Sequence, residues 1–121
     1  MLVLIVDDSP TLLASMEGVL TRYGHAVEKA GSGEEALAKL KGGLKPRLGI
    51  TDLNMGGMNG IEFIRQAKTV SGMAFTPMIM LTTESQQTKR DEAKKAGAAG
   101  WLVKPVSPDS LQQVVNQLVP A

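Results

Sequence analysis

The sequence predicts a doubly wound α/β domain built on a parallel sheet. Three observations support this: a chain of 121 residues suits one domain, its 43% hydrophobic and 21% charged residues are ordinary for a globular protein, and short apolar runs alternate with amphipathic segments. The chain contains no cysteine and one histidine, which excludes disulfides, thiol catalysis and a multi-histidine metal site. We expect one domain over residues 1–121.

Charge and hydropathy limit the classes of partner. The net charge is +1 and the pI is about 8.0, a balance that gives no indication of a nucleic-acid or membrane surface. The opening apolar run, Met1 to Val6, is far shorter than a membrane span and lacks the basic segment of a signal peptide. We therefore expect a soluble, cytoplasmic protein that binds neither nucleic acid nor membrane.

The first three elements follow from apolar runs and their breaks. A strand is expected at Leu2–Val6, because a continuous run of β-favouring residues is typical of a strand buried on both faces. Ser9 as N-cap and Pro10 as first helical residue favour a helix there, and apolar residues at helical spacing extend it to near Gly24. A short strand is expected next, at His25–Ala30.

The next two elements are a helix and a weaker strand. Ser32 and Glu35 form a capping-box pattern that opens a helix over Glu34–Leu40. Leu48–Thr51 has the character of a strand, although Gly49 weakens the prediction because glycine offers no side chain to pack.

The second half of the chain continues the alternation. Its expected elements are a helix over Gly60–Ala67, a strand over Met78–Leu81, a polar helix over Gln86–Ala96, a strand over Trp101–Val103 and a last helix opened by Ser107 and Pro108 that carries Leu111 to Leu118. Five strands alternating with five helices imply a parallel sheet covered on both faces, and right-handed crossovers leave few topologies. We predict the flavodoxin-like strand order 2-1-3-4-5.

Polar side chains stand at the ends of four of these five strands. They are Asp7 and Asp8 after the first strand, Asp52 after the third, Thr82 after the fourth, and Lys104 with Pro105 after the fifth. Carboxyl ends of parallel strands meet at one edge of the sheet, where ligands bind. Each residue alone is better explained by a turn, a cap or a solvated lysine. Their occurrence together at four strand ends favours a functional site.

The chemistry of this set points to phosphoryl transfer. Three neighbouring carboxylates repel one another unless a cation neutralises them, and Mg²⁺ with oxygen ligands is the natural cation. A carboxylate beside such an ion can act as a nucleophile towards phosphorus. The three equatorial phosphoryl oxygens would then be satisfied by Mg²⁺, the Lys104 ammonium and the Thr82 hydroxyl.

Four segments carry a family resemblance. Residues 4–9, 50–55, 81–84 and 104–105 resemble, in order and spacing, the signature segments of response-regulator receiver domains. The likeness covers the whole chain and is closest to stand-alone chemotaxis regulators of the CheY type, through residues 81–85 and 100–105. It implies a two-component, phosphorelay signalling protein that is not itself an enzyme.

The resemblance also implies roles for individual residues. Asp52 would be the phosphoacceptor, taking its phosphoryl group from a CheA-like histidine kinase. Mg²⁺ would be bound by carboxylates of Asp8 and Asp52, by Asp7 partly through water, and by the backbone carbonyl of Asn54. Lys104 and Thr82 would hold phosphoryl oxygens. The peptide bond from Lys104 to Pro105 would be cis.

Further roles concern the response to phosphorylation. Thr82 and Trp101 would form a conformational switch, with a half-buried tryptophan closing the sheet edge as the simpler alternative. Asn54 and Glu84 match positions that influence the lifetime of the phosphoryl group, or else are solvent-exposed. The partner surface would consist of the helix over 86–96, the strand over 101–103 and the last helix, and its partner would be an output protein such as the flagellar motor switch.

Three departures from the family pattern lie in one loop. Gly56 and Gly57 replace a segment that usually contains proline, and Asn59 stands where aspartate is common. Two adjacent glycines loosen a loop. This puts the rigidity of the loop, and with it the affinity for Mg²⁺, in question.

Other functions compete with chemotaxis regulation. A diffusible phosphorelay or phosphate-sink receiver is the alternative within the same class. A small phosphatase of the haloacid-dehalogenase type also uses an aspartyl phosphate, but its second aspartate, the general acid, is here Asn54, which cannot transfer that proton. A degenerate receiver acting as a scaffold is disfavoured because Asp7, Asp8, Asp52, Thr82 and Lys104 are all present.

Overall fold

The structure is a computed structural model that describes residues 1–83 and 86–119. Among these residues, five strands alternate with five helices, and the strands form one sheet with the order β2-β1-β3-β4-β5 in which neighbouring strands pair in parallel. This confirms the predicted flavodoxin-like fold. The elements are β1 Leu2–Val6, α1 Pro10–Arg22, β2 Ala26–Ala30, α2 Gly33–Lys41, β3 Leu48–Thr51, α3 Gly60–Ala67, β4 Met78–Thr82, α4 Gln87–Ala96, β5 Gly100–Val103 and α5 Pro108–Leu118.

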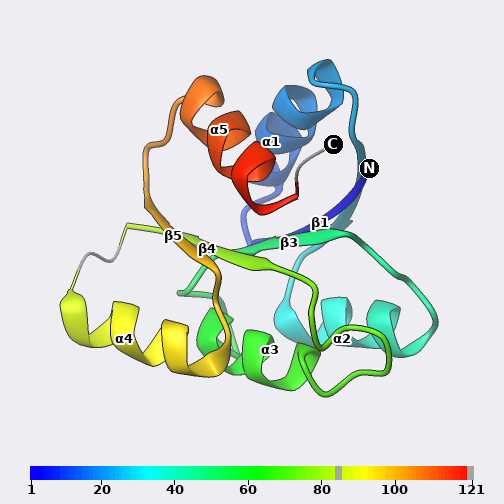
Figure 1. Cartoon of the computed structure of the whole chain (residues 1–121), viewed down its shortest axis with the longest axis vertical. Coiled ribbons are helices and arrows are strands. Elements are labelled where there is room, and N and C mark those ends of the chain that lie inside the picture. Colours follow the sequence, from blue (N-terminus) through cyan, green and yellow to red (C-terminus); the bar gives the residue numbers. More distant parts are fainter. Residues whose placement is uncertain (84–85, 120–121) are drawn as a thin grey trace.

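The sheet lies between two layers of helices. Figure 1 shows α1 and α5 on one face and α2, α3 and α4 on the other. Each face has its own apolar core, because successive residues of a strand point to opposite sides. Leu4 and Val6 of β1 belong to the core under α2, α3 and α4, whereas Val3 and Ile5 belong to the core under α1 and α5.

Capping residues set the starts of four helices, and the sequence predicts three of these caps, at Ser9, Ser32 and Ser107. Ser9, Ser32, Asn59 and Ser107 each accept a hydrogen bond from a backbone N–H in the first turn of α1, α2, α3 and α5, respectively. These bonds satisfy donors that a helix cannot satisfy internally. Each of these helices therefore begins within a residue of its predicted position, and the following side chains keep a fixed direction.

Two details differ from the sequence-based expectation. β2 begins at Ala26 rather than His25, because the His25 backbone N–H donates to the Leu20 carbonyl and closes the end of α1. Gly49 does not weaken β3, since all four residues of that strand are buried. A Cβ atom at Gly49 would lie 2.3 Å from the sulfur of Met78, so the space that glycine leaves is filled by the neighbouring strand's side chain.

Within residues 1–83 and 86–119, none of the helices has the length and apolar character needed to cross a bilayer.

Candidate functional site

The site lies at the carboxyl edge of the sheet, as predicted. Hydrogen bonding between neighbouring strands determines how far apart its residues lie. Val6 of β1 is in register with Thr51 of β3, so the residues that follow them, Asp7 and Asp52, leave neighbouring strands side by side. The Asp52 N–H donates to the Val6 carbonyl at 3.0 Å. On the other side of the site, the Lys104 N–H donates to the Thr82 carbonyl at 2.8 Å, extending the pairing of β4 and β5.

Three aspartates form an acidic cluster at this edge. Asp7, Asp8 and Asp52 each offer one carboxylate oxygen, and these oxygens all lie within 4.8 Å of one another. Asp7 is buried and Asp8 is exposed, so the cluster is open to solvent on the side of Asp8. Such an acidic cluster is typical of the receiver-domain metal site.

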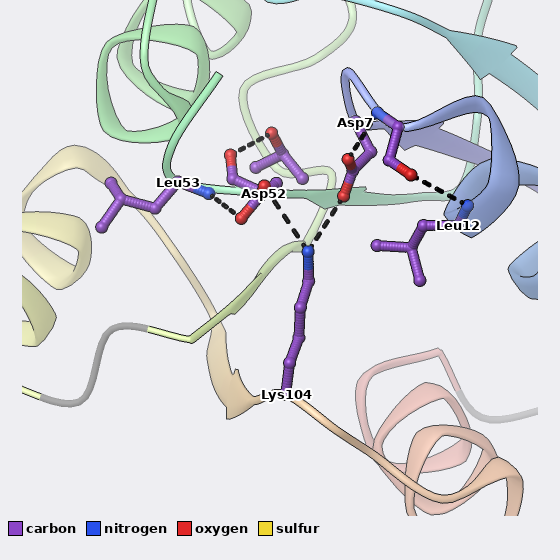
Figure 2. A network of polar contacts seen from close by, with 7 residues as sticks. Asp7, Leu12, Asp52, Leu53 and Lys104 are labelled. Carbon is purple, nitrogen blue, oxygen red and sulfur yellow. Dashed lines mark hydrogen bonds and ion pairs between the residues drawn. The ribbon is translucent and has the colours of Figure 1, made fainter.

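Lys104 supplies a positive charge to the cluster. Its Nζ lies 3.1 Å from Oδ2 of Asp7 and 3.5 Å from Oδ2 of Asp52, and Figure 2 shows the ammonium reaching between the two carboxylates. The peptide bond from Lys104 to Pro105 is cis, the isomer that the family resemblance implies. With all four groups ionised, the cluster carries two more negative than positive charges, which suits a divalent cation with oxygen ligands.

Backbone donors fix the other oxygen of each buried carboxylate. Oδ1 of Asp7 accepts from the Ser9 N–H at 2.9 Å, and Oδ1 of Asp52 accepts from the Leu53 N–H at 2.8 Å. Ser9 is itself anchored as the cap of α1, where its hydroxyl accepts from the Leu12 N–H at 3.2 Å (Figure 2). Asp7 and Asp52 thus each have one carboxylate oxygen hydrogen-bonded to a backbone N–H and the other directed towards Lys104.

Burial governs the protonation of Asp52. Removal from water disfavours its ionised form and raises the pKa of the carboxyl above its usual range. The Lys104 ammonium lowers this pKa, the charge of Asp7 raises it, and the hydrogen bond from Leu53 lowers it, so the net effect is upward. The ionised form of Asp52 is therefore electrostatically unfavourable, and a bound cation would stabilise it.

A stability prediction follows from this raised pKa. An acid whose pKa is higher in the folded state binds protons more readily there, so its contribution to stability is present at low pH and is lost as pH rises through the folded pKa. Asp52→Asn removes that loss. We expect the variant to unfold at higher urea concentration than the wild type at pH 7, with the difference shrinking as pH falls towards 4.

Urea denaturation followed by Trp101 fluorescence at several pH values measures this difference. Asp91→Asn serves as a control, because Asp91 is an exposed aspartate of α4. If Asp52→Asn gave the same stability difference at every pH, the pKa of the Asp52 carboxyl would not be raised in the folded protein.

The remaining predicted site residues are placed as follows. Thr82 ends β4 and is fully buried, in register with Val103 of β5. Trp101 is half-buried on β5, packs against the core under α2, α3 and α4, and lines a groove of about 320 Å³ together with Arg90 and Lys94 of α4. Asn54 is exposed in the loop after β3. Glu84 lies outside the described residues.

Sequence reasoning missed two features around the site. Gly60 begins α3 directly beneath Asp52, where a Cβ atom would lie 2.2 Å from the Asp52 carbonyl oxygen. Glu34 of α2 reaches the loop after β3, where its Oε2 accepts from the Met58 N–H at 3.4 Å. A glycine at the start of a helix and an acid in a helix's first turn are both common, so nothing in the sequence distinguished them.

Comparisons with known proteins agree with this geometry. The model of the response regulator receiver domain family matches residues 3–116. The protein PilH of Pseudomonas aeruginosa is 35% identical over 117 residues, which cover 97% of this chain and 96% of that protein. The chemotaxis protein CheY1 of Helicobacter pylori is 36% identical over 114 residues, covering 93% and 92% of the two chains.

A solved structure gives the same result. The chemotaxis protein CheY4 of Vibrio cholerae superposes with a TM-score of 0.93 at 40% identity and covers 98% of both chains. The likeness extends over the whole fold and includes the edge that carries the acidic cluster and Lys104. This chain belongs to the response regulator receiver domain family.

Proposed function

We propose that this chain is a response regulator phosphorylated on Asp52 in a Mg²⁺-dependent reaction, and that residues 1–121 form a single receiver domain. The observation that carries the proposal is the convergence of Asp7, Asp8, Asp52 and Lys104 from three strand ends on one small volume. Family membership implies a histidine kinase as the phosphodonor. The relatives named for chemotaxis support a role in chemotaxis or motility signalling.

The residues present fit a magnesium ion. Carboxylate oxygens are its preferred protein ligands, and the excess negative charge of the cluster matches a divalent cation. Asp7, Asp8 and Asp52 would hold the ion together with the backbone carbonyl of Asn54. The bound ion would neutralise the carboxylates and the oxygens of the incoming phosphoryl group.

In the proposed reaction, the ionised Asp52 carboxylate attacks the phosphorus of a phosphohistidine. The new O–P bond forms as the P–N bond breaks, and the imidazole nitrogen leaves with the electron pair. The Leu53 N–H and the strand pairing of the Asp52 backbone hold the nucleophile in place. Lys104 and the Thr82 hydroxyl would take two of the phosphoryl oxygens, as the charge of the group requires.

Transfer of the phosphoryl group to Asp52 would change the interaction partners of Lys104 and Thr82. In the unphosphorylated structure the Lys104 ammonium bridges two carboxylates, and after transfer it would turn to a phosphoryl oxygen instead. Movement of Thr82 at the end of β4 would leave room for Trp101 to turn inward, and Asn54 and Glu84 would influence the lifetime of the phosphoryl group. We propose that α4, β5 and α5 present this change to an output protein such as the flagellar motor switch.

Intact-mass analysis after incubation with acetyl phosphate tests the proposal. We expect the wild type to gain one phosphoryl group in Mg²⁺ and none when Mg²⁺ is chelated. Asp52→Asn should gain none, because an amide is not a nucleophile towards phosphorus, while the exposed-site control Asp91→Asn should behave as the wild type. A gain in Asp52→Asn equal to that of the wild type would move the acceptor elsewhere. No gain from acetyl phosphate or from any histidine kinase would overturn the proposal.

A further inference from the structure

The loop between β3 and α3 connects the phosphoacceptor strand to the helix beneath it. Both ends of the loop are fixed: the Gly60 N–H donates to the Leu53 carbonyl at 2.9 Å, and Oδ1 of Asn59 accepts from the Glu62 N–H at 2.9 Å as the cap of α3. Between these ends lie Asn54, which would contribute a backbone carbonyl to the metal, and the glycine pair that makes the loop intrinsically loose. Leu53 and Met55, on either side of Asn54, are buried in the core and anchor the first half of the loop, so the part left for a restraint from outside the loop is the glycine pair.

The first turn of α2 contacts the middle of this loop. Oε2 of Glu34 accepts from the Met58 N–H at 3.4 Å, and the Met58 side chain packs on Gly33, where a Cβ atom would lie 3.0 Å from the Met58 sulfur. Gly57 has a φ of +80°, and a Cβ atom there would lie 2.8 Å from Oε2 of Glu34. Two consecutive residues of α2 thus contact two consecutive residues of the loop.

The chemistry of Glu34 suits this task. An ionised carboxylate makes stronger hydrogen bonds than a neutral acceptor, and the first turn of a helix favours negative charge. Gly57 adopts a backbone conformation that other residues rarely adopt, and its lack of a side chain leaves room for the carboxylate. The contact is long and exposed, so its effect on overall stability is small. Its effect on the glycine-containing part of the loop is proportionally larger, because glycines have no side chain that could anchor that part to the core.

We propose that Glu34 is a positioning residue for the phosphorylation of Asp52. It holds the glycine-containing loop in the geometry that metal binding at Asn54 requires, and so replaces the restraint that a loop proline would give. This inference rests on the proposed function, and it assigns to Glu34 an effect on Mg²⁺ affinity rather than on the chemical step.

The test compares Glu34→Ala with Glu34→Gln and with Glu35→Ala. Glu35 is an exposed glutamate of the same helical turn, 4.0 Å from Lys39, and serves as the matched control. In the unphosphorylated protein, hydrogen exchange of the Met58 amide and Mg²⁺ affinity are measured by NMR. We expect Glu34→Ala to exchange about tenfold faster and to bind Mg²⁺ about threefold to tenfold more weakly, with Glu35→Ala close to wild type and Glu34→Gln, which keeps an acceptor oxygen without the charge, between the two.

Phosphorylation kinetics separate positioning from general damage. In Glu34→Ala, the Mg²⁺ concentration for half-maximal phosphorylation by acetyl phosphate should rise by the same factor, while the rate at saturating Mg²⁺ stays within about twofold of wild type. Gly56→Pro in the Glu34→Ala background should restore Mg²⁺ affinity. Gly56 is chosen because it does not have a positive φ and a Cβ atom at this position would meet nothing within 4 Å.

Several outcomes would overturn the inference. They are unchanged Mg²⁺ affinity and Met58 exchange in Glu34→Ala, an equal loss in Glu35→Ala, or a loss confined to the saturated rate. If the wild type accepted no phosphoryl group at all, the proposed function would fail, yet the exchange and Mg²⁺ titrations would still decide whether Glu34 positions the loop.

Discussion

Gly60→Ala should cost the protein about 3 kcal/mol of unfolding free energy, at the upper end of what overpacking usually costs. The reason is a backbone contact: the added Cβ atom would lie 2.2 Å from the Asp52 carbonyl oxygen and 2.9 Å from the sulfur of Met80. A side chain can turn away from such a contact, but a carbonyl at the end of a central strand cannot. The start of α3 must therefore move, and with it the hydrogen bond from the Gly60 N–H to the Leu53 carbonyl.

The same substitution at Gly18 provides a control with the opposite sign. Gly18 lies in the exposed middle of α1, and a Cβ atom there would meet nothing within 4 Å. We expect Gly18→Ala to stabilise the protein by about 0.5–1 kcal/mol, because alanine is the better helix former. Urea denaturation of both variants measures the difference. A Gly60→Ala protein as stable as the wild type would contradict the close packing of α3 beneath Asp52.

Displacement of the Asp52 backbone should also slow phosphorylation. The carboxylate is oriented by its own strand and by the Leu53 N–H, and both lie next to the carbonyl that the alanine would push. A misplacement of about 1 Å can cost a reaction about a hundredfold. Slower phosphorylation in folded Gly60→Ala protein would link the helix packing to the chemistry.

The fold was predictable because strand order depends on few features of the sequence. Short runs rich in β-favouring residues, each ended by a polar or glycine residue, identify most of the strands, and their alternation with helices leaves few topologies. Gly49 shows where this reasoning is limited. Its effect on β3 depends on Met78, which lies 29 residues further along the chain and fills the space from the neighbouring strand.

The acidic cluster was predictable for a similar reason. Parallel strands bring their carboxyl ends together whatever the side chains do, so residues that follow β1, β3 and β5 must meet. The sequence could not show which oxygen of each aspartate is held by the backbone, because that depends on the turn after each strand. It could not show Glu34 against Met58 either, since that contact depends on how α2 and the loop pack together.

Replacement of Lys104 by methionine should destabilise the protein strongly and make its stability depend on Mg²⁺. The ammonium lies 3.1 Å from Asp7 and 3.5 Å from Asp52, and methionine keeps the length of the side chain without its charge. Removing one partner of a buried ion pair typically costs about 3–5 kcal/mol, because the remaining charge is left uncompensated. We expect a value near 3 kcal/mol here, since the cluster is open to solvent on the side of Asp8.

Lys39→Met is the matched control for this substitution. Lys39 also forms an ion pair, 2.6 Å from Glu28, but both side chains are about one-third exposed. Pairs as exposed as this one contribute little to stability. Urea denaturation of the two methionine variants at pH 7 therefore separates the loss of a charge within the cluster from the loss of a lysine in general.

Added Mg²⁺ and a lower pH should each restore part of the unfolding free energy that Lys104→Met loses. Saturating Mg²⁺ stabilises whichever form binds it, and the gain should be larger in the variant because no ammonium competes for the same oxygens. Lys104 lowers the pKa of Asp52, so its removal raises that pKa further and the deficit should shrink as pH falls from 7 towards 4. If the loss of unfolding free energy in Lys104→Met depended on neither Mg²⁺ nor pH, Lys104 would stabilise the fold by packing. The lysine would then lack the electrostatic interaction with the carboxylates on which the proposed reaction depends.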